Sequence, residues 1–525
     1  MTACGKTLIN HTQYLSNLQP AFFWQHTQNQ HTLFILESVA DLRYKTIKVI
    51  NQQKYLAKCA PMEANKRQVE MKLNHECVYV FETKGEMVPS KFRRKVWQIL
   101  PSICATLMCL PFGIMLGWPS PTYPTLVQPG APVWISMDQS AMVAGFLMIG
   151  NTVSTPFSTI DRIGAKYGII IGASLITIGW ILMWQARDIF WLLGSRFLIG
   201  AGNGFGTGQV KLYITEICQD SLAQTMAKQI NLYVFLGVVM AFSYGPFVDF
   251  RNFSIINSIL SVLVLFLAIF LPSTPRELVK SGKMTEARKL IAFLSPDLSV
   301  SEEIVKIKER INAPDCSLGF CDLVRDKSLR RSLVVFVGLV FFGQFSGAIA
   351  TLVYSQMIFE RTHCPRPEMC ALAYALIFLV ANFYGTFCVP SHNKKYVLLF
   401  SSIGVSVLLV LNIVVLVEEL NVQFWQFTSL VGLLLYILVY TVGLGTVPVL
   451  LIPELFPKEA NKVVVQFFVM SNSMLALTIT KIFQVLFTNM GLVTPLCLFL
   501  TASTFSIIFV IIFVPNKSNN KSNNT

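Results

Sequence analysis

The sequence has little charge. Only 13% of its 525 residues are Asp, Glu, Lys or Arg, whereas soluble globular domains carry about 25%. By contrast, 53% of the residues are hydrophobic, and Phe alone supplies 40 of them. A soluble domain cannot bury this much apolar surface and still cover itself with charge. The composition therefore argues against a soluble enzyme and a disordered chain, and it favours a helical protein that crosses a membrane several times.

The sequence also lacks the motifs of catalysis. It holds no His, Cys, Asp and Glu cluster at metal-ligand spacing, no nucleophile motif and no phosphate-binding loop. Glycine does recur at every second position over 200–208, but this stretch is apolar and no strand precedes it. We interpret it as a place where helices approach closely rather than as a nucleotide loop. We therefore expect no enzymatic activity, no metal and no cofactor.

Apolar runs long enough to cross a bilayer, which takes about 20 residues, recur from Lys95 onward. The first six candidate spans are 98–117, 138–158, 167–186, 190–210, 226–245 and 254–272. After a polar stretch, six more follow at 332–354, 371–390, 396–417, 424–450, 463–487 and 489–514. This pattern predicts an all-α membrane protein with twelve transmembrane helices in two pseudo-symmetric six-helix halves.

The spans divide the chain into five parts. We predict a partly disordered cytoplasmic tail over 1–96 and a six-helix half over 97–272. A cytoplasmic linker over 273–330 follows, in which apolar residues at helical spacing predict short amphipathic helices. The second six-helix half covers 331–514, and a short cytoplasmic tail covers 515–525.

The excess charge is basic. Lys and Arg number 42 and Asp and Glu 28, which gives a formal net charge of +14. The basic residues gather before the first span, in the linker and in alternate loops, whereas residues 118–137 contain none. Since cytoplasmic loops of membrane proteins are rich in Lys and Arg, both termini and the linker should be cytoplasmic. This explains the charge without nucleic acid, and we expect the bilayer and a small solute as partners of a monomer.

Two cysteines share one polar loop between apolar runs. Cys364 and Cys370 are six residues apart in this loop. They would form a disulfide if the loop were extracellular and oxidised, and would otherwise remain free thiols. The sequence leaves both alternatives open.

Polar side chains inside the spans are costly and therefore informative. Gln344 and Ser346 lie in span 7, Asn231 in span 5 and Asn472 in span 11. An amide both donates and accepts hydrogen bonds, so these residues suit a ligand that offers hydroxyl groups. Sites near the midplane between two halves are typical of transporters. The alternative, that these amides hold helices together, remains open.

Charges also cluster at span ends that we assign to the cytoplasmic side. We expect them to form an ionic latch whose pairs break and reform as a carrier changes conformation. The predicted latch residues are Asp161, Arg162, Lys166, Arg196, Glu216, Lys394 and Glu454. Topogenic charge is the alternative, although it accounts only for the bases and not for Glu216 and Glu454.

Short motifs in a fixed order resemble those of a known family. They are Gly117–Pro121, Asp161–Lys166, Arg196 with Tyr213 and Glu216, Pro272–Arg276, Gln344–Gly347 with Tyr354, Pro453–Pro457, and Asn472 with Thr480–Gln484. Over residues 95 to 517 the chain resembles the sugar porter family of the major facilitator superfamily, and within it the insect facilitated trehalose transporters. The resemblance implies facilitated uniport of trehalose or a hexose in the plasma membrane. It adds Tyr354 to the predicted substrate site.

The chain also departs from the pattern of this family. Gly343 and Ile349 replace a Gln and an Asn of span 7, Ser473 replaces a Trp of span 11, and Lys211 replaces a Pro of span 4. Each lost buried contact to a hydroxyl weakens binding by about 1–3 kcal/mol. Two further functions therefore remain open: a carrier of a less hydroxylated organic solute, and a non-transporting sensor or receptor.

One sequence motif concerns modification. Asn252-Phe253-Ser254 forms a glycosylation sequon in the predicted extracellular loop between spans 5 and 6. Because the sequon lies close to the bilayer, its use is an open question. The prediction is a possible glycan on Asn252.

Overall fold

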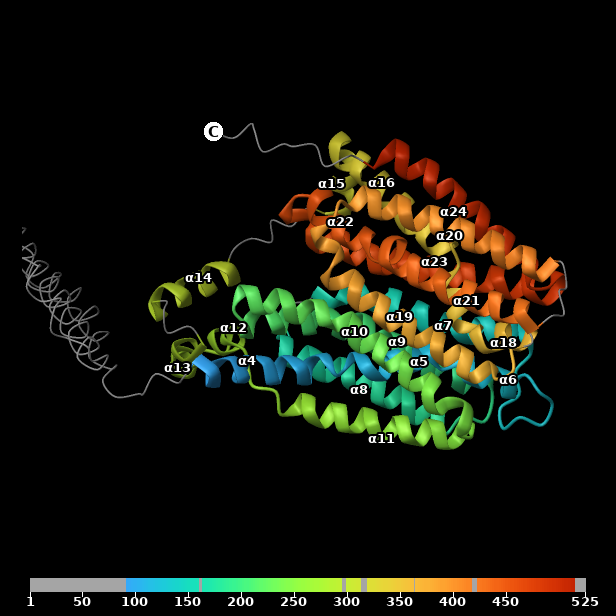
Figure 1. Ribbon diagram of the computed structural model, residues 1–525. Coiled ribbons are helices and arrows are strands. Elements are labelled where there is room, and N and C mark those ends of the chain that lie inside the picture. Colours follow the sequence, from blue (N-terminus) through green and yellow to red (C-terminus); the bar gives the residue numbers. More distant parts are fainter. Residues whose placement is uncertain are drawn as a thin grey trace, which may run out of the picture. The chain divides into compact units, whose positions relative to one another are not determined.

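We describe a computed structural model over residues 91–159, 163–294, 299–312, 319–362, 364–417 and 423–514. Figure 1 shows long helices that run roughly side by side, and the described residues contain no strand. The first half contains the helices α4 (Lys91–Thr106), α5 (Cys109–Gly117), α6 (Pro119–Leu126), α7 (Met137–Ser154), α8 (Ala165–Trp184), α9 (Ile189–Ile217), α10 (Asp220–Tyr244) and α11 (Phe250–Ile269). Short 3-10 turns, η2 (Thr155–Thr159) and η3 (Gly245–Phe247), follow α7 and α10.

Four short helices occupy the region between the halves: α12 (Pro275–Lys280), α13 (Met284–Leu294), α14 (Val300–Asn312) and α15 (Phe320–Arg325). Leu278, Val279 and Ala287 form a small buried core between α12 and α13. At the start of α14 the Glu302 amide donates to the Ser299 hydroxyl at 3.3 Å. This side-chain cap satisfies an amide that has no partner within the helix.

The second half contains α16 (Lys327–Phe345), α17 (Ala348–Val353), α18 (Ser355–Arg361), α19 (Pro367–Phe387), α20 (Lys394–Val417), α21 (Gln423–Tyr440), α22 (Val447–Leu455), α23 (Asn461–Met490) and α24 (Val493–Phe513). A π-helical turn, η5 (Thr441–Gly445), joins α21 to α22, and the 3-10 turns η4 (Val389–Ser391) and η6 (Lys458–Ala460) precede α20 and α23. Gly347 separates α16 from α17 at φ 90°, a conformation that favours glycine.

Each predicted span coincides with one helix or with consecutive helices, so the all-α membrane fold is confirmed. Ten helices among the described residues are long and apolar enough to cross a membrane. The two other long helices of the predicted spans are α7 and α9, which contain more polar residues. Spans 1, 7 and 10 are interrupted helices, which the apolar pattern did not predict.

The predicted close approach of helices at the α9 glycines is confirmed. A Cβ atom on Gly200 would lie 2.0 Å from the Leu147 carbonyl oxygen of α7. A Cβ atom on Gly202, on another face of α9, would lie 2.6 Å from the Gly172 carbonyl oxygen of α8. Only glycine therefore permits α9 to pack this closely between its two neighbours.

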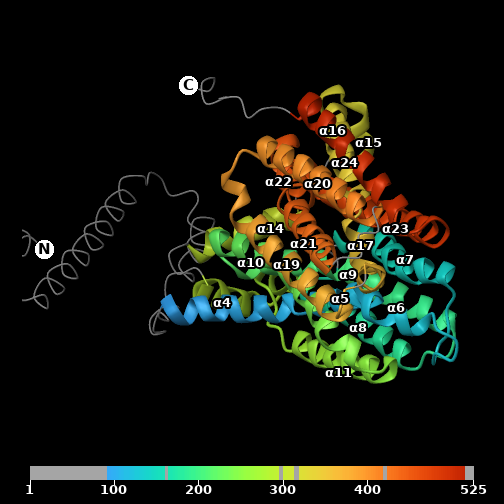
Figure 2. The ribbon, with the colours of Figure 1, turned by 45° about the vertical axis from the view of Figure 1, so that its right-hand side comes forward.

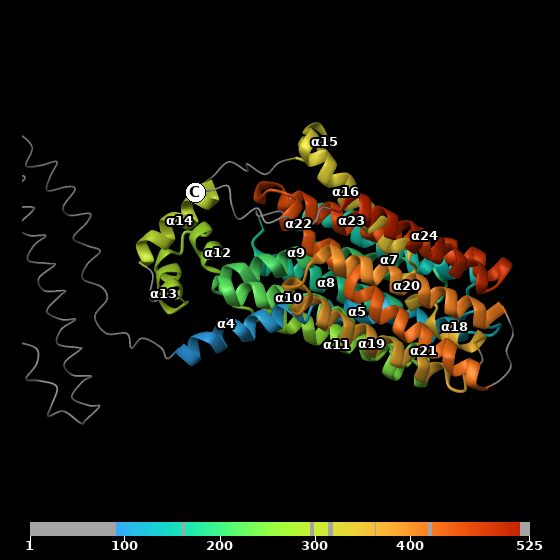
Figure 3. The same ribbon diagram turned by 45° about the horizontal axis from the view of Figure 1, so that its top comes forward.

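The two halves meet where α7 lies beside α23 and where α10 lies beside α19 (Figure 2). We call the end of the bundle with α12–α14 the linker end, and the opposite end with α6 and α18 the far end (Figures 1 and 3). Helix α9 runs from the far end to the linker end, and α10 returns from the linker end.

Candidate functional site

A chain of hydrogen-bonded side chains crosses from one half to the other. On α9, the Thr207 hydroxyl donates to Asn203 Oδ1 at 3.1 Å. Asn203 Nδ2 donates to Asn151 Oδ1 of α7 at 3.0 Å, and Asn151 Nδ2 donates to the Ser473 hydroxyl of α23 at 2.8 Å. Asn151, Asn203 and Ser473 are all buried. Since a buried amide without partners is costly, this chain fixes the relative rotation of α7, α9 and α23.

The predicted residues Gln344 and Asn472 lie together beside this chain. Gln344 Nε2 of α16 donates to Asn472 Oδ1 of α23 at 2.5 Å, and Asn472 is the neighbour of Ser473 in sequence. Gln344 is only 6% exposed, yet its Oε1 atom accepts no hydrogen bond from any described residue. A buried acceptor without a donor costs about 1–3 kcal/mol. A hydroxyl group of a bound solute would supply that donor.

We call Asn151, Asn203, Gln344, Asn472 and Ser473 the central polar cluster. Its members come from α7 and α9 of the first half and from α16 and α23 of the second. The cluster offers uncharged amides and hydroxyls, which can bind and orient a hydroxylated solute but provide no group for acid–base or nucleophilic catalysis. Of the described residues, no three His, Cys, Asp or Glu side chains are grouped so that they could hold a metal ion.

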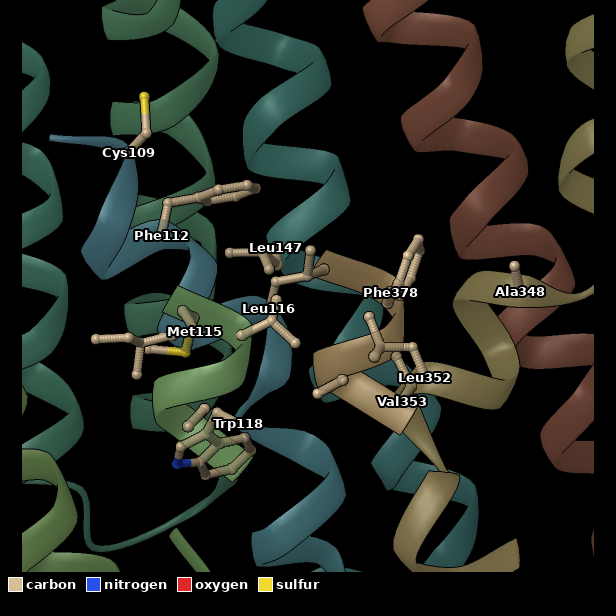
Figure 4. Close-up of a cluster of buried hydrophobic side chains, with 14 of the residues drawn as sticks. Cys109, Phe112, Met115, Leu116, Trp118, Leu147, Ala348, Leu352, Val353 and Phe378 are labelled. Atoms are coloured by element: carbon tan, nitrogen blue, oxygen red, sulfur yellow. The ribbon is translucent and has the colours of Figure 1, made fainter. Parts of the chain in front are cut away.

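An apolar contact between the halves lies on the far-end side of the bundle. Figure 4 shows Leu116 of α5 and Leu147 of α7 pointing toward Val353 of α17 and Phe378 of α19. All four side chains are buried. Phe378 also contacts Phe235 of α10, with ring centroids 4.4 Å apart. Apolar side chains therefore join the halves at this level.

Buried hydroxyl groups join the two halves at the far end. The Ser120 hydroxyl of α6 and the Ser355 hydroxyl of α18 are 2.8 Å apart. The Ser140 hydroxyl of α7 shares a hydrogen bond of 2.9 Å with the hydroxyl of Tyr354, whose ring lies 5.8 Å from that of Tyr123. Each of these five residues is at most 2% exposed. The far end is therefore closed in this structure, and Tyr354 is one of the residues that close it.

An ion pair on the same side also joins α7 to α23. Lys481 Nζ lies 3.8 Å from Asp138 Oδ1, and Gln484 Nε2 donates to the same carboxylate at 3.0 Å. Both charged side chains remain substantially exposed, so the pair adds at most about 1 kcal/mol.

The predicted latch residues at the linker end form contacts within the second half and between the first half and the linker. Lys394 Nζ of α20 lies 2.5 Å from Glu454 Oε1 of α22, so the structure brings these two predicted residues together. Glu216 of α9 lies 3.5 Å from Arg276 of α12. The backbone amide of Lys166 donates to Glu277 Oε1 of α12 at 2.7 Å. Asp161 and Arg162 lie outside the described residues.

The prediction that Arg196 belongs to a cytoplasmic latch is wrong. Arg196 and Glu216 lie 20 residues apart on the continuous helix α9, which separates them by about 30 Å. The Arg196 guanidinium lies 4.4 Å from the centroid of the Trp118 ring and donates to the Met115 carbonyl oxygen at 3.0 Å. It is 1% exposed and packs near the far end. The prediction failed because it placed the start of span 4, where Arg196 lies, at the same end of the bundle as Glu216.

The other predicted residues take different positions. Ser346 is fully buried and its hydroxyl contacts the Phe342 carbonyl oxygen and Ser503 of α24, so it joins helices of the second half. Asn231 is exposed on α10. Asn252 is exposed in the first turn of α11, whereas Ser254 of its sequon is fully buried. Glycosylation stays a prediction.

A family model described as sugar (and other) transporter matches residues 121–522. The chain belongs to this family. The facilitated trehalose transporter Tret1 of Apis mellifera ligustica is 24% identical over 451 residues, which cover 83% of this chain and 89% of that protein. Solute carrier family 2, facilitated glucose transporter member 8 of Mus musculus is 25% identical over 445 residues, covering 79% and 91%.

Solved structures confirm the fold of this sugar transporter family member. The inward open conformation of the xylose transporter XylE from E. coli matches with a TM-score of 0.67 at 16% identity, covering 80% of this chain and 97% of that one. A partially occluded inward open conformation of XylE matches with a TM-score of 0.65. The major facilitator fold predicted from the sequence is therefore confirmed, and so is the resemblance to sugar porters.

Two members of the central polar cluster were not among the predicted site residues. Asn151 and Asn203 are buried amides in spans 2 and 4 of this sugar transporter family member. A signal was present, because α7 and α9 are the long helices that fall short of the apolar character of the other spans. The number of polar residues in each span therefore points to Asn151 and Asn203.

Proposed function

We propose that the protein is a facilitative carrier that moves a small hydroxylated solute, a sugar such as trehalose or a hexose, by alternating access. The observation that carries the proposal is the buried Gln344 Oε1 atom, which has no donor among the described residues and lies beside Asn472 at the junction of the halves. Membership in the sugar transporter family and the similarity to trehalose and glucose transporters support the same substrate class.

The contacts between the halves support alternating access. The far end is closed by Ser120–Ser355 and Ser140–Tyr354. At the linker end, Lys394–Glu454 lies within the second half and Glu216–Arg276 joins the first half to the linker, while Gln466 of α23 donates to the Thr155 and Pro156 carbonyl oxygens of η2. Such an arrangement suits a state that opens toward the linker end. We further propose that this end faces the cytoplasm with both termini, that the carrier is a monomer in the plasma membrane, and that it has no enzymatic activity.

Uptake of radiolabelled trehalose and glucose into oocytes tests this proposal. The native protein should raise uptake above that of water-injected cells, and Gln344→Ala should lower it about tenfold, as expected for a lost contact of about 1.4 kcal/mol or more. Gln128→Ala is the matched control, because it removes an amide that is exposed in the segment after α6. Uptake of both sugars equal to that of water-injected cells, despite normal surface expression, would reject the proposal.

A carrier of a less hydroxylated solute is the second candidate. Apolar side chains at Ile349, Phe378 and Val449 favour it, and Phe378 is buried between the halves. A thermal-shift screen in detergent separates the two, because a ligand of the native state raises the melting temperature. Stabilisation by sugars alone would exclude the second candidate.

A further inference from the structure

Two lysines of the first half lie inside the bundle, on the consecutive helices α9 and α10. Lys211 is six residues before Ile217, the last residue of α9, and Lys228 is eight residues after Asp220, the first residue of α10. At 1.5 Å per residue, both side chains start about 9 to 12 Å inside the bundle from the linker end. The two lysines thus lie at a similar depth on consecutive helices.

Lys211 is on the face of α9 that leads into the central polar cluster. Asn203, Thr207 and Lys211 are spaced four residues apart, so they share one face of the helix. Asn203 is linked through Asn151 to Ser473 of the second half. Lys211 and Thr207 also lie near Cys109 of α5, which Figure 4 places at one end of the apolar contact.

Lys228 occupies the corresponding face of α10. Lys228, Asn231 and Phe235 are spaced three and four residues apart, which also places them on one side of the helix. The Phe235 ring contacts Phe378 of the second half at 4.4 Å. Lys228 and Asn231 therefore look toward the second half, nearer the linker end than the aromatic contact. Both are exposed.

A lysine whose side chain extends along its own helix to the lipid–water interface is a common arrangement. On α10 the outer face is the one with Leu232 and Leu236, which line an apolar groove with Leu379 and Val380 of α19. At 3.6 residues per turn, Lys228 lies about 20° around the helix axis from Phe235 and about 40° and 80° from Leu232 and Leu236, so it lies nearer the side that meets the second half. Lys211 is exposed, although it lies near the buried Cys109 of α5.

Neither ammonium group forms an ion pair with a described residue. The nearest acid along α9 is Glu216, which lies 3.5 Å from Arg276. In the described spans every Asp and Glu lies at a helix end or in a connecting segment. Two cations that face the same region without an acidic partner make that region attractive to anions, and an anionic oxygen on such a group forms strong charge-assisted hydrogen bonds.

We propose that Lys211 and Lys228 form an anion-binding site between the halves, so that the preferred solute has a carboxylate or phosphate group as well as hydroxyls. This inference rests on the proposed carrier function and narrows its substrate class. The hydroxyl groups bind at the central polar cluster, and the anionic group binds on the linker-end side of it, with Asn231 beside Lys228.

Competition for uptake tests the site. Labelled glucose and labelled gluconate are each offered to oocytes with unlabelled glucose, gluconate or glucose 6-phosphate as competitor. In the native protein, gluconate or glucose 6-phosphate should compete at concentrations at least tenfold lower than glucose, and the better of the two distinguishes carboxylate from phosphate. Lys211→Met and Lys228→Met should each weaken the anionic competitor about ten- to a hundredfold.

Three controls keep the outcomes distinct. Lys289→Met, which removes an exposed lysine on α13, should change nothing, and Lys211→Arg should retain the preference for anions. Surface biotinylation corrects each variant for the amount of folded protein. Glucose uptake with anions no better than glucose, in native protein and lysine variants alike, overturns the anion site and leaves the carrier function standing.

The remaining outcomes also test the anion site and the carrier function. Gluconate uptake that the lysine variants lose, in the absence of glucose uptake, supports the anion site and overturns transport of neutral sugars. No uptake of any of these solutes by a normally expressed native protein overturns both the anion site and the carrier function.

Discussion

Tyr354→Phe should open the far end without unfolding the protein. The substitution removes the hydroxyl that bonds to Ser140 across the halves at 2.9 Å and keeps the ring that stacks on Phe483. Ser140 retains its hydrogen bond to the Met137 carbonyl oxygen at 2.7 Å, so no group is left wholly unpaired. The loss is then the net value of one hydrogen bond, about 0.5–1.5 kcal/mol.

That free energy sets the size of the effect. If the closed far end loses about 0.5–1.5 kcal/mol relative to the open state, the population of the open state rises about two- to twelvefold. A cysteine at Thr122, which is 4% exposed on α6, reports this population through its reaction rate with a membrane-impermeant maleimide. The parent protein without this cysteine provides the background from native thiols.

A matched control distinguishes gating from general loosening. The Tyr374 hydroxyl is equally buried and bonds to Thr351 at 2.8 Å, but both residues belong to the second half. Tyr374→Phe should therefore leave the labelling rate unchanged. Equal acceleration by both variants, or none by Tyr354→Phe, would refute the assignment of Tyr354 to the closure of the far end.

The remaining predictions concern packing, redox state and charge. Gly200→Ala should lower the melting temperature and the surface expression, because its Cβ would lie 2.0 Å from a backbone oxygen of α7; Gly194→Ala, with no atom within 4 Å, should be neutral or slightly stabilising. Mild oxidation should remove two hydrogens by joining Cys364 to Cys370, whose thiols are in contact, and intact-protein mass spectrometry should show no such loss in Cys364→Ser. Glu454→Gln should change the free energy of unfolding by no more than about 1 kcal/mol, because its ion pair is partly exposed; a thermal shift of more than 5 °C would contradict this.

The helices could be predicted because their cause is local. A run of about 20 apolar residues has to form a helix in a bilayer, where every backbone group must be paired within the segment. The breaks in spans 1, 7 and 10 are different, since they depend on neighbours. At Gly347, for example, a Cβ atom would lie 2.2 Å from the Phe499 ring of α24, a contact that no local pattern reveals.

The site was predicted only in part for a related reason. Gln344 and Asn472 stood out because an amide in an apolar run is unusual, but their pairing depends on how α16 and α23 are rotated. The lower apolar character of their spans marks Asn151 and Asn203 in the sequence, but their bonds to each other and to Ser473 depend on how α7, α9 and α23 pack. Arg196 was misplaced because a motif gives the residue type without its depth, and depth follows from where helix α9 begins.

Counterflow in proteoliposomes tests the central claim most directly. Vesicles preloaded with unlabelled sugar are diluted into a low concentration of the labelled sugar, and entry of label is followed. A carrier with one alternating site should show a transient accumulation of label above equilibrium, which Gln344→Ala loses and Gln128→Ala keeps. The absence of any accumulation for neutral and acidic sugars alike, with correctly folded native protein, would contradict the claim that the halves share one alternating solute site.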